Sequence, residues 1–91
     1  MTGGWKYEEF ENCKLPEQVE AGWAQVFSNH LGVEFTPALY CGSQVVNGTN
    51  YMIIAKARTI TNPSREYMAT IILYSDLEGH FSLVSVDEIK P

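Results

Sequence analysis

The spacing of apolar residues changes once along the chain. Between residues 16 and 31 the steps from one apolar residue to the next are four, three, one and four, which place these residues on one helical face. They are Val19, Trp23, Val26, Phe27 and Leu31. Pro16 suits a first helical turn, and the carboxylates of Glu17 and Glu20 suit the positive end of the helix dipole. The pattern therefore predicts an amphipathic helix over residues 16–31, stopped by Gly32.

After Gly32 the period falls from 3.6 to 2, which is typical of strands. In the first alternating stretch we expect one side to be shared by Val33, Phe35, Leu39 and Cys41. Pro37 and Gly42 interrupt that stretch, as a bulge or a bent edge strand would. Three further strands are predicted over residues 51–59, 65–74 and 81–89, with turns at TITNPSRE and SDLEGH between them.

One strand shows the alternation most clearly. We expect two sets of its side chains to lie on opposite faces of the sheet. One set is Tyr51, Ile53, Ala55 and Ala57, and the other is Met52, Ile54, Lys56 and Arg58. Short connections make consecutive strands antiparallel neighbours. We therefore predict an α+β fold, one N-terminal amphipathic helix packed on a curved four- to five-stranded antiparallel sheet. The fifth strand would come from residues 1–15, which otherwise form a loose lead-in.

Composition narrows the class of protein. The 91 residues are 45% hydrophobic and 19% charged, which fits a single globular domain over residues 1–91. A net charge of −5 repels phosphate backbones, so no nucleic-acid partner is expected. No apolar run approaches the roughly 20 residues of a membrane helix, so no membrane partner is expected either. The N-terminus lacks the features of a secretory signal, which favours a cytoplasmic protein, with a processed secreted form as the alternative.

The cysteines and histidines give little support for catalysis. The spacing of Cys13 and Cys41 fits neither a metal site nor a CxxC motif, and two free, half-buried thiols are preferred to a disulfide. His30 or His80 beside a cysteine could form a nucleophilic pair, but Cys41 is expected to face the core. We therefore expect that the protein is not an enzyme and that it has no catalytic residue, no metal site and no cofactor.

The stretch QVVNGTNY, residues 44–51, is the candidate site. Asn47-Gly48 between two apolar strands predicts a hairpin with a type I′ turn. Val45 and Val46 are neighbours, so one of them must face solvent or the tip of the hairpin. An apolar side chain on a rigid tip is a candidate contact surface.

The same stretch resembles the first-hairpin motif of the cystatins, which are reversible inhibitors of papain-like cysteine proteases. The family pattern Gln-x-Val-x-Gly is met by Gln44, Val46 and Gly48, and its usual continuation by Thr49, Asn50 and Tyr51. Gly3-Gly4 lies about forty residues upstream, near the spacing of the N-terminal glycine in the stefin branch. With a single helix between the two and the strands in matching order, the resemblance covers nearly the whole chain.

The resemblance implies a mechanism and a set of contact residues. In cystatins an N-terminal trunk and two hairpins line up along one edge, which enters the protease cleft without reacting with the catalytic cysteine. The implied protease-binding residues are Gly3, Gly4 and Trp5 in the trunk, Gln44, Val45, Val46, Asn47 and Gly48 in the first hairpin, and Leu77, Glu78, Gly79 and His80 in the second. The implied partner is a papain-like cysteine protease. The chain would act as a monomer, with a domain-swapped dimer as the alternative.

Two departures from the family pattern keep a second hypothesis open. Asn47 stands where the family usually has alanine, and the second hairpin lacks the Pro-Trp or Leu-Pro pair of family members. The alternative is a non-inhibitory cystatin-fold module that binds another protein.

Overall fold

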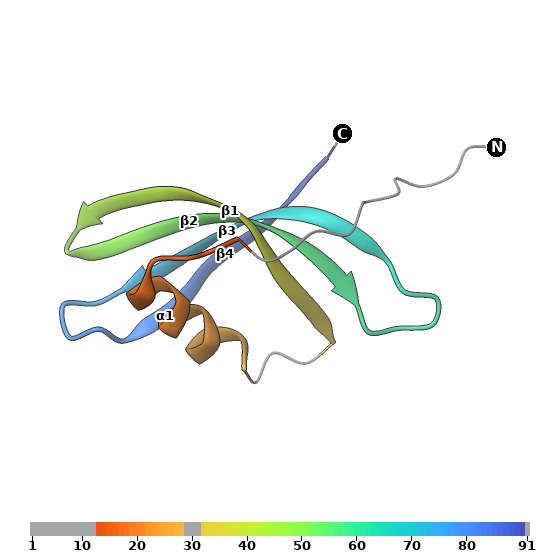
Figure 1. Ribbon diagram of the computed structural model, residues 1–91, viewed down its shortest axis with the longest axis horizontal. Helices are drawn as coiled ribbons and strands as arrows, with labels where there is room; N and C mark the ends of the chain where they lie inside the picture. The colour runs from red at the N-terminus through yellow and green to blue at the C-terminus, as the bar shows by residue number, and fades with distance from the viewer. Residues whose placement is uncertain (1–12, 29–31, 91) are drawn as a thin grey trace.

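In the part of the chain that the structure describes, one helix packs on one antiparallel sheet (Figure 1). The computed structural model describes residues 13–28 and 32–90. Its elements in chain order are α1 (Glu17–Phe27), β1 (Val33–Val46), β2 (Gly48–Thr59), β3 (Glu66–Ser75) and β4 (Phe81–Ile89). The strands pair in the order β1-β2-β3-β4, and α1 lies across one face of the sheet. The predicted α+β layout is confirmed with four strands, and the residues of the proposed fifth strand before Cys13 lie outside the described part.

The helix starts where the sequence predicts. Pro16 has φ −53° and ψ 147° and caps the helix, and its carbonyl accepts a hydrogen bond from the Glu20 amide at 2.8 Å. Glu17 and Glu20 occupy the first turn, at the positive end of the dipole. The helix ends at Phe27 with Ser28 as its C-cap, and residues 29–31 of the predicted helical stretch are not among the described residues.

The core lies between α1 and the face of the sheet that we call the inner face. Six side chains of β2 and β3 are fully buried there: Ile53, Ala55, Ala57, Ala69, Ile71 and Leu73. Val19 of α1 and Leu15 pack against this face. The predicted alternation of β2 is confirmed for Ile53, Ala55 and Ala57, which are buried on this face, although Lys56, on the other face, is buried as well.

The prediction for the faces of β1 is partly wrong. Leu39 and Cys41 are exposed, whereas Phe35 and Tyr40 pack against the core. The register of β1 against β2 shifts between Pro37 and Leu39 and again between Tyr40 and Gly42. Each shift inserts an unpaired residue, which moves the following side chains to the other face of the sheet. The expected interruption of this strand is confirmed, but its consequence for Leu39 and Cys41 was missed.

Two further features of the chain are the state of its cysteines and the length of its helix. Both cysteines are free, as expected, although Cys41 lies on the surface and only Cys13 is half-buried. Burial raises the pKa of the Cys13 thiol. The one helix in the described part of the chain is too short and polar to cross a membrane.

Candidate contact edge

The two hairpins lie at the same end of the sheet. Asn47 is the tip of the β1–β2 hairpin, and residues 76–80 connect β3 to β4. The sheet register places Thr49 beside Ser75 and Ser75 beside Phe81, so the two turns are neighbours (Figure 1). We call residues 44–48 and 76–80 the hairpin edge. The structure thus brings together the two hairpin parts of the predicted site: Gln44, Val45, Val46, Asn47 and Gly48, and Leu77, Glu78, Gly79 and His80. The predicted trunk residues Gly3, Gly4 and Trp5 lie outside the described residues.

Apolar side chains point outward at both turns. Val45 is 82% exposed and Leu77 is 81% exposed, while Val46 is about half exposed. The prediction that one of the two valines meets solvent is confirmed, and in fact both do. The β1–β2 hairpin projects past α1 in Figure 1, so no helix covers its tip. The hairpin edge therefore offers two separated apolar contacts on one side of the molecule.

The predicted type I′ turn at Asn47-Gly48 is wrong. That turn needs positive φ at both central residues, but no residue other than glycine has positive φ in the described part of the chain. Gly48 alone supplies it, with φ +110°. A Cβ on Gly48 would lie 2.4 Å from the Ser75 carbonyl oxygen, so β3 also excludes a side chain here.

The tip of the first hairpin is held from the neighbouring strand. The Tyr74 hydroxyl donates a hydrogen bond to the Asn47 carbonyl. Behind the tip, the Asn50 side-chain amide donates to Gln44 Oε1 at 3.3 Å, which connects the two strands of the hairpin. Sequence reasoning missed Tyr74, because its place beside Asn47 follows from the β2–β3 register rather than from any local motif.

The second turn is organised by a single carboxylate. Asp76 Oδ1 accepts hydrogen bonds from the backbone amides of Glu78 and His80, both at 2.9 Å. Asp76 Oδ2 lies 3.3 Å from His80 Nδ1. The hydrogen bond from the His80 amide is the main reason that the pKa of Asp76 is lowered. Asp76 was also missed, although an aspartate that opens a glycine-containing turn is a recognisable signal.

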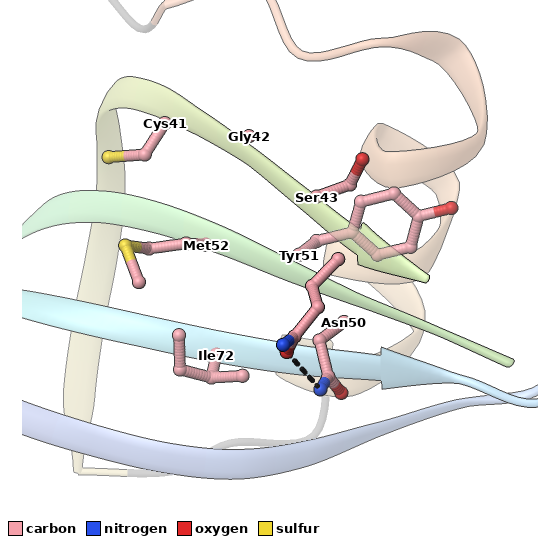
Figure 2. A pocket seen from close by; sticks show the side chains of 8 residues that line it. Cys41, Gly42, Ser43, Asn50, Tyr51, Met52 and Ile72 are labelled. Atoms are coloured by element: carbon pink, nitrogen blue, oxygen red, sulfur yellow. Dashed lines mark hydrogen bonds between the residues drawn. The ribbon is translucent and has the colours of Figure 1, made fainter. Parts of the chain in front are cut away.

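A shallow groove runs along the sheet next to the first hairpin (Figure 2). It has a volume of about 540 Å³ and lies among residues 41–44 of β1, residues 50–52 of β2 and Ile72 of β3. Figure 2 shows Cys41, Met52 and Ile72 in a row across three strands. No histidine or carboxylate lines the groove, and no cluster suited to a metal ion occurs among residues 13–28 and 32–90. What the groove offers is apolar and amide surface.

Comparison of the chain with family models, with curated proteins and with solved structures gives no significant match.

Proposed function

We propose that this chain is a cystatin-like, reversible inhibitor of papain-like cysteine proteases, and that the hairpin edge is the surface that enters the active-site cleft. One observation carries the proposal. The Gln-x-Val-x-Gly motif from Gln44 to Gly48 forms the tip of a hairpin, and the exposed Leu77 lies on the turn beside it. The helix-on-sheet layout supports a cystatin-like fold as part of the same proposal.

Binding would rest on contact rather than on chemistry. Burying an exposed valine or leucine side chain is worth about 1.5–3 kcal/mol, so Val45 and Leu77 supply the apolar part of the contact. The Tyr74 hydrogen bond and the Asp76 turn fix both tips before a protease arrives. Preformed tips lose little conformational entropy on binding, which favours affinity. This mechanism uses no nucleophile, metal or cofactor of the chain.

The N-terminal residues of the expected interface are also part of the proposed contact surface. Gly3, Gly4 and Trp5 are proposed to add a third contact to the two hairpins, as the trunk does in cystatins. The proposed setting is the cytoplasm, and the proposed partner is a protease of the papain class.

Titration of the purified chain into active papain tests this function. Residual hydrolysis of a small peptide substrate is measured at each protein concentration, and then again after dilution. We expect activity to fall at nanomolar to low micromolar protein and to return on dilution. Full activity at a large excess of the chain would contradict inhibition of papain.

A second candidate is a non-inhibitory cystatin-fold module that binds another protein. Two observations favour it: Asn47 is exposed at the very tip of the first hairpin, and the Glu78 side chain is 82% exposed on the second. Both place polar or charged groups where a protease cleft would have to accept them. Full papain activity, together with a purified partner that binds a surface other than the hairpin edge, would support this candidate over the first.

A further inference from the structure

The face of the sheet opposite α1, which we call the outer face, carries an apolar patch. It consists of Leu39 in β1, Met52 and Ile54 in β2, Ile72 in β3 and Val84 at the register shift of β4. Register places Leu39 beside Ile54 and Met52 beside Ile72, so the patch continues from strand to strand. Leu39, Met52 and Val84 are 54%, 44% and 58% exposed. Outward positions of a sheet covered on one side are normally polar, so a continuous apolar patch here indicates a contact surface.

The charges on this face nearly balance. Two cations of β2 lie next to the patch, and each has a carboxylate partner: Lys56 lies 3.7 Å from Glu66, and Arg58 lies 3.2 Å from Glu34. Asp87 adds one more outward carboxylate in β4, opposite Thr70. The outer face of the four strands therefore holds one net negative charge of the five that the whole chain carries. Because the charge on this face is nearly balanced, two copies of this acidic chain can approach along it with little repulsion.

We propose that the outer face binds the outer face of a second copy of this chain, about a two-fold axis. Four strands about 4.8 Å apart and about ten residues long present roughly 600 Å² of sheet, somewhat less than the roughly 800 Å² per partner of a standard interface. Interfaces of this size are typical of weak complexes, so we expect the dimer to form only at high protein concentration. Val45 has the register of the inner face and Leu77 lies in a turn, so these two contacts of the hairpin edge stay free, whereas Gln44 and Val46 have the register of the outer face. This inference does not rest on the proposed function.

Sedimentation equilibrium of the full chain from low micromolar to near-millimolar concentration tests the proposal. The parent is expected to change from monomer to dimer across this range. Met52→Lys puts a cation in the centre of the patch and is expected to weaken the dimer by at least about tenfold. Ile60→Lys is the matched control, because Ile60 is 66% exposed but lies in the β2–β3 connection, off the outer face. Both positions are exposed, so both variants are expected to fold, and circular dichroism checks this.

The reactivity of Cys41 maps the interface independently. Its exposed thiol lies beside Met52 in the groove of Figure 2. In a Cys13→Ser background, alkylation of Cys41 is expected to slow as protein concentration rises, and to stay constant in Met52→Lys.

Three results would overturn the proposal. One is a parent that remains monomeric at every concentration. Another is a dimer that Met52→Lys leaves intact, which would move the interface to a sheet edge, as in strand exchange. The third is a monomeric full chain beside a dimeric chain lacking residues 1–12, which would make those residues the occupant of the patch.

Discussion

The two hairpins of the hairpin edge lie at the same end of the sheet but obtain their shape in different ways. The first depends on another strand: Gly48 is pressed against Ser75, and the Tyr74 hydroxyl holds the Asn47 carbonyl. The second depends on itself, because Asp76 accepts hydrogen bonds from two amides of its own turn. One tip is thus fixed by tertiary packing and the other by local hydrogen bonds. Changes in the sheet are therefore expected to reach the first tip and to spare the second.

The two glycines provide the strongest test of this comparison. Both have positive φ, +110° at Gly48 and +88° at Gly79, so alanine is strained at each. At Gly79 nothing lies within 4 Å of the place that an alanine methyl group would take, whereas at Gly48 the Ser75 oxygen would lie 2.4 Å from it. We expect Gly79→Ala to lower the free energy of unfolding by about 1 kcal/mol and Gly48→Ala by about 3 kcal/mol. Urea unfolding of both variants measures this, and equal losses would contradict the difference between the hairpins.

Removal of the Tyr74 hydroxyl tests whether its hydrogen bond holds the first tip in place. Tyr74→Phe deletes the hydrogen bond to the Asn47 carbonyl and keeps the ring, so we expect a loss of about 1 kcal/mol in the free energy of unfolding. Amide exchange is expected to quicken at Gly48 and Thr49 and to stay unchanged in residues 76–80. Tyr67→Phe, at the other end of β3, is the control. Faster exchange in both hairpins would show that Tyr74 stabilises the sheet as a whole rather than the tip.

Acid is expected to act on the second hairpin and not on the first. The pKa of Asp76 is lowered from its ordinary value of 3.8, chiefly by the hydrogen bond from the His80 amide. Its contribution is therefore fully present above the unfolded value and is lost as pH falls through the lower folded value. Below about pH 4 the amide signals of Glu78 and His80 should shift toward those of a disordered turn, while those of Gly48 and Thr49 remain.

Local probes are needed for that experiment, because the pKa of a second carboxylate, that of Glu88, is also lowered. The Arg65 side chain, hydrogen-bonded to Glu88 at 2.6 and 2.7 Å, lowers the pKa of Glu88 at the other end of the sheet. Asp76→Asn should remove the acid response of the second hairpin, and Glu88→Gln should leave it in place. An acid response that survives Asp76→Asn would assign it to another group.

The features that sequence could predict are those set by local patterns. The helix start at Pro16 and the alternation of β2 follow from spacing, and the positions of the connections follow from turn residues. The faces of β1 could not be predicted beyond Pro37, because a bulge shifts the register by one residue and alternation alone does not locate it. The same holds for the first turn. Asn-Gly predicts type I′ in an isolated hairpin, but here Tyr74 and Ser75 of β3 surround the tip.

The candidate site also contains some residues that the sequence predicts and others that only the structure identifies. Gln44 to Gly48 and Leu77 to His80 were found from a motif and from turn spacing, and the structure places both on one edge. Tyr74 was beyond reach, since only the register brings it to Asn47. The sequence alone shows that the apolar residues Met52 and Ile54 alternate with the buried residues of β2. Only the structure shows that no described element covers the outer face on which they lie.

The central claim is that the hairpin edge blocks a protease cleft, and a pair of matched variants tests it most directly. Val45→Asp places a carboxylate at the tip of the first hairpin, and Ile60→Asp places one on a similarly exposed residue at the opposite end of the sheet. The inhibition constant of each against papain is compared with that of the parent. We expect Val45→Asp to weaken inhibition by at least about tenfold, since it removes an apolar contact and brings a charge into the cleft, and Ile60→Asp to match the parent. Equal inhibition by the two variants, or none by the parent, would contradict the claim.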